Sequence, residues 1–136
     1  MAVDYTTVTE ASGVQVTRQA VKIIYSRYCF ALPYCDNKDV LEVACGAGLG
    51  LGLLGQKASR LVAGDCTAGL LAEAARSYSS RFPLLRFDAH CLPFKNQSFD
   101  VVILFEALYY LATPEFFLKE CRRILRPNGI VLISTV

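Results

Sequence analysis

The sequence has few charged residues and no long apolar run, and both absences restrict what the protein can be. Charged residues make up 19% of the 136 residues, and a net charge of +2 is too small to favour nucleic acid or an anionic membrane as a partner. No run of eighteen apolar residues predicts a transmembrane helix, and the N-terminus lacks the basic stretch and apolar core of a signal peptide. We therefore expect no nucleic-acid partner, no membrane partner and a cytoplasmic protein.

Residue spacings typical of metal sites are also missing. The six cysteines form no CxxC pair, and the single histidine, His90, adds no zinc-like spacing. Four of the cysteines lie in apolar or glycine-rich runs, where a free thiol behaves as a small hydrophobic side chain. We expect reduced thiols and no metal site.

Apolar residues, in contrast, reach 54% of the chain, which a single domain explains if its strands are buried on both faces. Short β-branched runs alternate with helical periodicity, and this order predicts parallel strands joined by right-handed crossovers. The predicted strands are 40–44, 60–65, 84–88, 101–105 and 130–136. Helices are predicted over 15–32, from the glycine-rich loop to about 58, and after the N-caps Thr67 and Thr113.

Four finer expectations follow from local sequence. Pro33 should stop the first helix, and residues 126–129 (RPNG) should break the last one. The fourth strand is nearly all apolar, so we expect it at the centre of the sheet. The apolar residues of the first helix recur at intervals of three and four and predict its buried face as Val21, Ile24, Tyr25, Tyr28, Cys29 and Leu32.

The most informative stretch is residues 40–50, VLEVACGAGLG. A β-branched run ends in alternate glycines, as where a parallel strand passes into a helix through a turn that approaches a ligand closely. A residue without Cβ suits such a turn, because the ligand must touch the backbone. The carboxylate of Glu42 fits a ligand with donor or cationic groups better than a bare phosphate. Alternatively, Glu42 is buried and ties down the amides of the loop.

The dinucleotide fingerprint G-x-G-x-x-G fits this loop poorly. Counted from Gly46, the third glycine is replaced by Leu51. Residues 50–55 match the string, but they lie inside the predicted helix, where we interpret the glycines as close helix–sheet packing.

The stretch from Glu42 to Gly50 instead resembles the first motif of class I S-adenosylmethionine-dependent methyltransferases, an acid followed by glycines at alternate positions. Gly46, Gly48 and Gly50 stand in those positions. Ala44 stands where the family usually has its first glycine, and we expect its methyl group to cause slight crowding and to leave binding intact.

The resemblance continues along the chain. Asp65 ends the second strand nineteen residues after Gly46, and an acid there in the family accepts from both ribose hydroxyls. Asp88-Ala89 resembles the family pair that contacts the adenine edge. Residues 92–94 (LPF), 98–102 (SFDVV) and 120–129 (ECRRILRPNG) resemble the branch that methylates small molecules, called methyltransferase type 11-like.

The resemblance implies an α/β fold: a Rossmann-like, doubly wound sheet of five parallel strands with helices on both faces, without the C-terminal strands of the family fold. It implies S-adenosylmethionine as the cofactor, bound by a core at residues 40–136, with a helical lid or cap at residues 1–39. The implied cofactor-binding residues are Glu42, Ala44, Gly46, Gly48, Asp65, Cys66, Asp88, Ala89 and Phe105.

Plainer interpretations stand beside these roles. Asp65 could cap the turn after its strand, and Asp88 could be an ordinary turn aspartate. Asp100 is interpreted as structural, because it begins its strand whereas ligands lie beyond the carboxyl ends. His90 is more often a loop histidine than a catalytic one.

The implied reaction moves a methyl group from a sulfonium to a nucleophilic atom of a small-molecule acceptor, by in-line displacement. No catalytic residue stands out; His90, Glu106, Tyr109 and Tyr110 are candidates to line the acceptor side. Two other hypotheses are a nicotinamide- or flavin-binding domain and a cofactor-binding module without turnover. The apolar fifth strand ends the sequence with an unpaired edge, which predicts a fragment of a longer protein or a homodimer.

Overall fold

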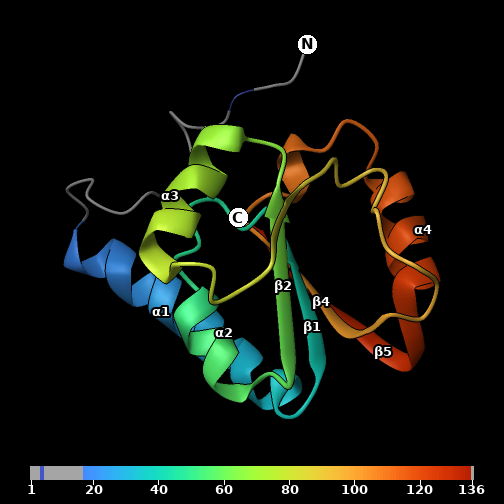
Figure 1. Cartoon of the computed structure of the whole chain (residues 1–136), viewed down its shortest axis with the longest axis horizontal. Coiled ribbons are helices and arrows are strands. Elements are labelled where there is room, and N and C mark those ends of the chain that lie inside the picture. Colours follow the sequence, from blue (N-terminus) through green and yellow to red (C-terminus); the bar gives the residue numbers. More distant parts are fainter. Residues whose placement is uncertain (1–3, 5–16, 136) are drawn as a thin grey trace.

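Alternating apolar strands and amphipathic helices produce a parallel sheet covered by helices on both faces (Figure 1). The computed structural model describes Asp4 and residues 17–135. In chain order its elements are α1 (Arg18–Cys35), β1 (Asp39–Val43), α2 (Leu51–Lys57), β2 (Arg60–Asp65), α3 (Ala68–Tyr78), β3 (Leu84–Arg86), β4 (Phe99–Phe105), the 3-10 helix η1 (Leu108–Tyr110), α4 (Pro114–Ile124) and β5 (Leu125–Ser134). The predicted α/β, doubly wound class with five parallel strands is confirmed.

The strand order is β3-β2-β1-β4-β5, and every pair of neighbours is parallel. The central strand is therefore β1; the prediction of a central β4 was wrong, although β4 is paired on both sides. From β1 the chain winds outward to β2 and β3, and then crosses back to β4 on the other side. The carboxyl ends of β1 and β4 thus form the topological switch point, where open α/β sheets bind ligands.

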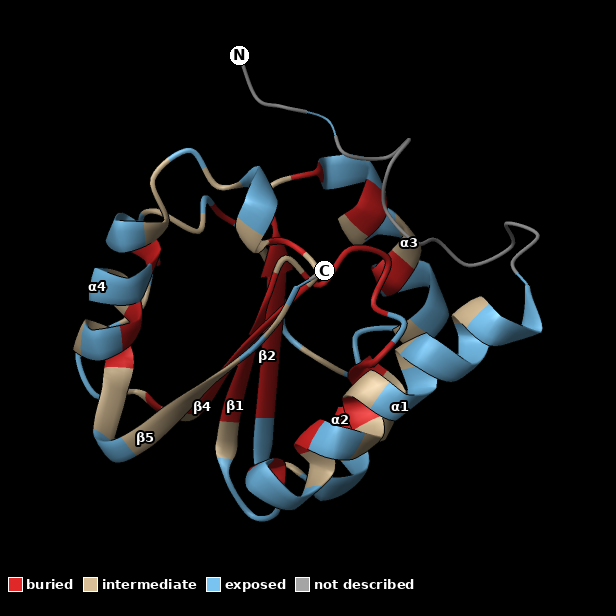
Figure 2. Cartoon of the chain, turned by 180° about the vertical axis from the view of Figure 1, so that it is seen from behind, coloured by how far each residue is buried: buried red, intermediate tan, exposed pale blue. Residues whose placement is uncertain are grey.

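Side chains of each interior strand alternate between two cores. Val40 of β1 packs under α1 and α2 with Tyr28 and Leu54, whereas its neighbour Leu41 packs against Phe117 of α4. Figure 2 shows β1, β2 and β4 buried along most of their lengths and β5 only half-buried. At the edge, Ile133 of β5 is 38% exposed.

Helix α1 runs past the point where the sequence predicted its end. Pro33 lies in its last turn and the helix ends at Cys35, because a proline there removes only one late hydrogen bond. The predicted apolar face is correct for Tyr28 but wrong for Val21 and Tyr25, which are 51% and 57% exposed. The predicted start at Gln15 lies outside the described residues.

Two segment boundaries also differ from expectation. α4 passes directly into β5 at Leu125, and residues 126–129 form an irregularity inside the strand, where the register shifts between Phe99 and Val101 of β4. The guanidinium of Arg126 fills this irregularity and donates to Asp39 at 2.8 Å and to Asp100 at 3.1 Å. β3 ends at Arg86, so Asp88 lies in the following loop.

Three observations concern the remaining expectations. All six cysteines are free thiols, and burial raises the pKa of Cys35 to about 11 and that of Cys121 to about 12. Among residues 17–135 and Asp4, no group of three or more His, Cys, Asp or Glu side chains could hold a metal ion. None of the helices that the structure describes is long and apolar enough to cross a membrane.

Candidate functional site

The loop that leaves β1 has an unusual backbone. Ala44, Gly46 and Gly48 adopt φ angles of 57°, 57° and 81°, in the left-handed region. The alternation of left-handed residues turns the chain sharply beyond the carboxyl end of the central strand. The predicted effect of Ala44 was therefore misplaced: the difficulty is backbone strain at a positive φ, where alanine carries a Cβ penalty that glycine lacks.

Asp65 at the end of β2 holds this loop from the side. Its carboxylate is 6% exposed; Oδ2 accepts from the Gly46 amide at 2.9 Å and Oδ1 accepts from the Thr67 amide at 2.8 Å. Asp65 therefore does cap the turn after its strand, as the plainer interpretation held. Since each carboxylate oxygen accepts two hydrogen bonds, both oxygens keep capacity for a ligand.

Glu42 is the most buried acid of the site, at 1% exposure. Its Oε1 accepts a hydrogen bond from the Tyr28 hydroxyl of α1, and among the residues that the structure describes no group bonds to its buried Oε2. The pKa of Glu42 is raised to about 8, mainly by burial and also by the charge of Asp65, while the Tyr28 bond and Arg27 act to lower it. A cationic group brought to Oε2 would favour the ionised carboxylate. The alternative in which Glu42 ties down loop amides is wrong, because its partner is a tyrosine.

Two tyrosines, Tyr28 and Tyr78, fix the loop. A Cβ on Gly50 would lie 1.9 Å from the ring of Tyr28, so the glycine makes room for the ring whose hydroxyl reaches Glu42. Tyr78 of α3 donates to the Gly48 carbonyl at 2.6 Å and accepts from the Gly52 amide at 3.2 Å. No sequence pattern could have revealed either contact, since each joins elements far apart in the chain.

The glycines within residues 50–55 were expected to pack closely against the sheet. Their neighbours are aromatic rings instead: Tyr28 meets Gly50, and a Cβ on Gly55 would lie 2.5 Å from the ring of Phe82. Close packing was correctly predicted, but its partner was not.

The loop after β3 has its own polar group. Asp88 Oδ1 accepts from the amide of His90 at 2.8 Å and lies 2.6 Å from Nδ1 of the same histidine. These bonds lower the pKa of Asp88, the backbone bond most strongly. Ala89 lies between the two residues. At the end of β2, the Cys66 carbonyl accepts from Arg86 Nε at 2.9 Å.

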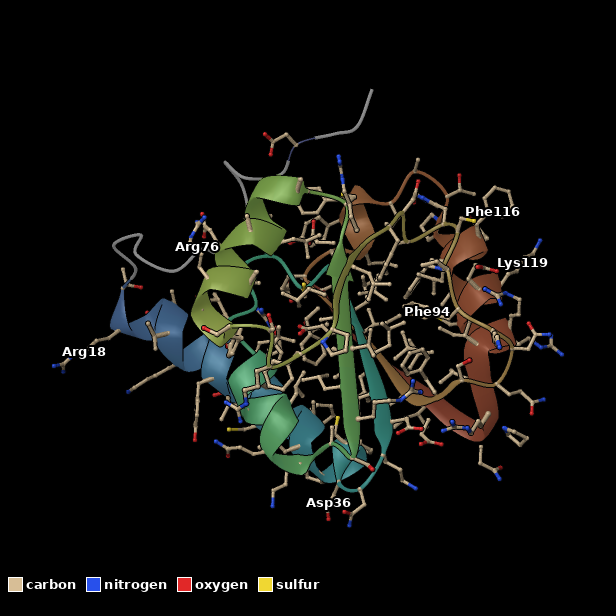
Figure 3. All side chains as sticks on the ribbon, viewed as in Figure 1. Arg18, Asp36, Arg76, Phe94, Phe116 and Lys119 are labelled. Carbon is tan, nitrogen blue, oxygen red and sulfur yellow. The ribbon has the colours of Figure 1, made fainter. Side chains whose placement is uncertain are left out.

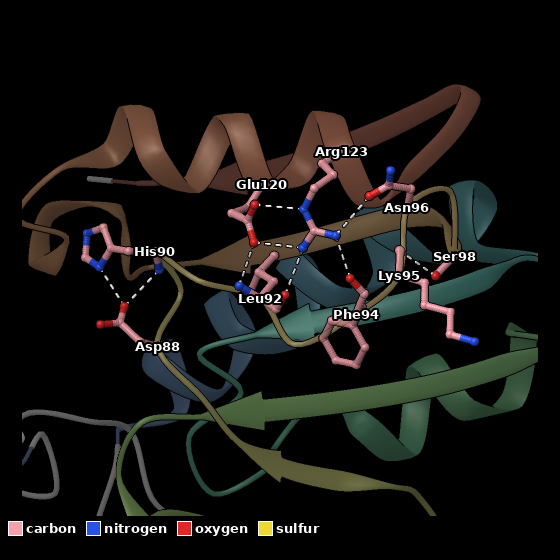
Figure 4. Close-up of polar contacts among 9 residues, drawn as sticks. All are labelled: Asp88, His90, Leu92, Phe94, Lys95, Asn96, Ser98, Glu120 and Arg123. Atoms are coloured by element: carbon pink, nitrogen blue, oxygen red, sulfur yellow. Dashed lines mark hydrogen bonds and ion pairs between the residues drawn. The ribbon is translucent and has the colours of Figure 1, made fainter.

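A side-chain clamp fastens the next part of this loop to α4 (Figure 4). Arg123 donates to the carbonyls of Leu92 and Phe94 at 2.8 and 2.6 Å and to both oxygens of Glu120 at 2.8 Å. Glu120 in turn accepts from the Leu92 amide at 2.8 Å. The clamp places the ring of Phe94 on the inner side of α4, edge-on to Phe99 with the ring centres 5.1 Å apart (Figure 3).

Comparison with known proteins identifies this arrangement. The model of the family described as "Methyltransferase domain" matches residues 41–133. The chain belongs to this family. A probable S-adenosylmethionine-dependent methyltransferase of Mycobacterium tuberculosis is 32% identical over 114 residues, which are 84% of this chain and 40% of that protein. A malonyl-[acyl-carrier protein] O-methyltransferase of Marinomonas is 29% identical, over 85% of this chain and 44% of that protein.

Comparison with solved structures finds the same fold in methyltransferases. Phosphoethanolamine N-methyltransferase 1 of Haemonchus contortus, solved with phosphoethanolamine and S-adenosylhomocysteine, has a TM-score of 0.79 at 21% identity, covering 96% of this chain and 30% of that one. S-adenosylmethionine is accordingly the cofactor of this methyltransferase domain. The chain spans about two fifths of the length of the curated relatives it matches.

The residues present fit that cofactor. The unpartnered Oε2 of Glu42 and the remaining lone pairs of Asp65 suit a ligand with hydroxyl and cationic groups. Their predicted partners in binding, Phe105 and Asp88, stand at the same edge of the sheet, because all follow the carboxyl ends of parallel strands.

An open groove of about 520 Å³ lies beside this edge, between α1 and the ends of β4 and β5. Phe105 and Glu106 line it; Phe105 is 8% exposed and its ring meets that of Tyr28 edge-on at 5.4 Å. Glu106 adopts a left-handed φ of 51°, accepts from the Ser134 hydroxyl at 3.0 Å and lies 3.7 Å from Arg27. Of the predicted acceptor-side residues, only Glu106 lines this groove.

Tyr109 and Tyr110 lie instead in η1, 50% and 40% exposed, with their ring centres 4.6 Å apart. His90 is linked to the segment after η1, because its Nε2 accepts from the Thr113 amide at 3.2 Å. Asp100, interpreted as structural, lies at the opposite end of β4, where it accepts from the Asp39 amide at 2.9 Å.

Proposed function

We propose that this protein transfers the methyl group of S-adenosylmethionine to a small-molecule acceptor. The observation that carries the proposal is the set of hydrogen bonds at the switch point. There, Asp65 fixes the left-handed Gly46 beside a buried acid, Glu42, that keeps one oxygen unpartnered. Family membership supports the cofactor over the nicotinamide or flavin alternative.

Each predicted residue takes one part of the cofactor in this proposal. Asp65 accepts hydrogen bonds from the ribose hydroxyls with its remaining lone pairs. Cys66, the next residue in the chain, binds the cofactor beside it. Gly46 and Gly48, with Ala44, let the amino-acid end of the cofactor approach the backbone. Those assignments rest on the family resemblance together with the positions of these residues at one edge of the sheet.

Two further parts complete the cofactor site. Glu42 offers its unpartnered oxygen to the cationic end of the ligand, and the ring of Phe105 forms a wall. Asp88 accepts from the adenine amino group, with Ala89 beside it. The cap at residues 1–39, of which α1 is the described part, covers the site in this proposal.

The bound cofactor supplies an already activated methyl group, so the protein mainly orients the acceptor and excludes water. Holding the two reactants in line contributes roughly 7–11 kcal/mol to the lowering of the barrier. We place the acceptor in the groove between α1 and the ends of β4 and β5, where Glu106 can accept a proton from an acceptor hydroxyl or amine. The names of curated relatives, such as the malonyl carrier-protein O-methyltransferase, support a metabolite as acceptor. A cytoplasmic location belongs to this proposal as well.

Calorimetric titration with S-adenosylhomocysteine tests the cofactor site. Asp65→Ala removes the acceptors of the ribose hydroxyls and should weaken binding by about 2–4 kcal/mol. Asp100→Asn is the matched control, because that acid lies at the opposite end of the sheet and should leave affinity unchanged. Equal affinities for Asp65→Ala and the parent protein, with both folded by circular dichroism, would remove Asp65 from the site.

A second experiment separates an enzyme from a binding module without turnover. The protein is incubated with methyl-labelled cofactor and a panel of small carboxylic acids, phenols and amines. Labelled product that disappears in the Gly46→Val variant supports catalysis at this site. Tight cofactor binding without transfer to any member of the panel, in the full-length gene product as well, favours the module.

A further inference from the structure

A polar chain of three residues, Asp88, His90 and Thr113, begins in the loop after β3 and extends beyond the proposed cofactor site to the segment before α4. Asp88 Oδ1 receives two hydrogen bonds from one residue, the amide and the ring Nδ1 of His90. The other ring nitrogen, Nε2, accepts from the Thr113 amide just before α4. An amide always donates, so Nε2 must be unprotonated and Nδ1 must carry the ring proton. The fold therefore selects one neutral tautomer of His90.

This arrangement leaves Asp88 with one available oxygen. The two bonds from His90 use both lone pairs of Oδ1 and fix the orientation of the carboxylate. Among the described residues no group bonds to Oδ2, and the Asp88 side chain is 68% exposed. An ionised carboxylate only accepts hydrogen bonds. Oδ2 is thus an oriented acceptor that suits an amino group and disfavours a carbonyl oxygen.

We propose that His90 is a positioning residue that orients Asp88 to recognise the 6-amino group of the cofactor's adenine. The inference rests on the proposed function, specifically on the contact between Asp88 and adenine. It adds a role to a histidine that the family motif leaves undefined. The hydrogen bond from the Thr113 amide contributes to this positioning, because it fixes the plane of the His90 ring from the side of α4.

A plainer interpretation is that His90 only joins the β3 loop to α4. Two near-isosteric variants separate the alternatives. His90→Asn keeps a donor at the position of Nδ1, and so keeps the bond to Asp88, but it cannot reach Thr113. His90→Gln keeps an acceptor near the position of Nε2, and so keeps the bond to Thr113, but loses the side-chain bond to Asp88.

The probes are S-adenosylhomocysteine and its 6-oxo analogue, S-inosylhomocysteine, titrated into the whole 136-residue chain. The parent protein should prefer the 6-amino ligand by about tenfold or more, because the carbonyl of the analogue would face Asp88 Oδ2. His90→Asn should retain this preference within threefold. In His90→Gln the preference should fall below threefold, since the carboxylate then keeps only the bond from the backbone amide of residue 90 and can turn about it.

A structural linker would give a different pattern. If His90→Gln retains the full preference, or if His90→Asn loses it as completely, the positioning role is overturned while the proposed function stands. If the parent protein binds both ligands equally, the adenine contact and the role of His90 both fail. If it binds neither ligand, the proposed function itself fails.

A measurement on the unmodified protein keeps the test independent of folding in the variants. His90 is the only histidine in the sequence, so its ring nitrogens give unambiguous signals in ¹⁵N magnetic resonance spectra. We expect the Nδ1-protonated tautomer at pH 8, with and without S-adenosylhomocysteine. A ring protonated at Nε2 instead would contradict the bond to Thr113 and overturn the proposal.

Discussion

Replacing Glu42 with glutamine should make the protein more stable at alkaline pH, although it alters the most buried acid of the site. The ordinary pKa of a glutamate is 4.5, and burial raises that of Glu42 to about 8. A carboxyl whose pKa rises on folding stabilises the native state fully below its unfolded pKa and loses that contribution as the pH rises to its folded value. For Glu42 the window lies between pH 4.5 and about 8.

The size of the effect follows from the shift. Because one pKa unit corresponds to about 1.4 kcal/mol, ionising Glu42 removes at most about 5 kcal/mol of folding free energy. Admission of water to the carboxylate would reduce this figure. Glutamine keeps an acceptor for the Tyr28 hydroxyl and does not ionise. Residue 42 therefore adds no pH dependence to the stability of the Glu42→Gln variant in this window.

The assay is urea unfolding of the parent protein and Glu42→Gln at pH 5, 6, 7, 8 and 9. The difference in unfolding free energy should grow by several kcal/mol in favour of the variant between pH 5 and pH 9. Other ionisable groups cancel in this difference. Asp100→Asn is the control: its partners lower the pKa of Asp100, so its effect changes only under acid conditions. A difference for Glu42→Gln that stays constant from pH 5 to pH 9 would refute the reasoning.

Three further predictions concern stability and assembly. Ala44→Gly removes a left-handed alanine, which costs about 1–2 kcal/mol, and adds about 0.4–1 kcal/mol of unfolded-state entropy, so a net gain of roughly 0–1.6 kcal/mol is expected in urea unfolding. A loss of stability would contradict the strained backbone at Ala44. Arg123→Gln releases the carbonyls of Leu92 and Phe94 and should cost about 2–3 kcal/mol, whereas Arg122→Gln on the exposed side of α4 should change stability by less than about 0.5 kcal/mol. The half-buried edge strand β5 should make the chain self-associate in light scattering, and Ile133→Lys should weaken this association; a monodisperse monomer at high concentration would show that the edge is protected.

The parts of the fold that could be predicted from sequence depend on local patterns. Strands buried on both faces appear as short apolar runs, and the left-handed turns after β1 appear as alternate glycines. Asp65 was singled out as a cofactor-binding residue because its position depends only on the end of one strand and the distance along the chain to Gly46. Its bond to Gly46 was not predicted.

Two of the errors share a physical cause, since each depends on contacts between distant segments. Tyr28 could not be paired with Glu42 from the sequence, because helical periodicity places an aromatic residue on a face without specifying its partner. The same holds for residues 126–129, where the Arg126 bonds to Asp39 and Asp100 keep a turn-like sequence within a strand. Pro33 was misjudged because the penalty of a proline depends on how many turns of helix follow it.

The structure also divides the family motifs by what they do. The residues of the branch signature, LPF at 92–94 and Glu120 with Arg123, bond mainly to each other and close the loop between β3 and β4 over the sheet. These bonds hold the loop to α4, so a match at these positions indicates the domain. In the proposed function the cofactor is bound instead by Glu42, Gly46 and Asp65, which lie together at the switch point. If the acceptor binds in the groove beside Glu106, as proposed, its identification has to begin there, because the lining residues belong to neither motif.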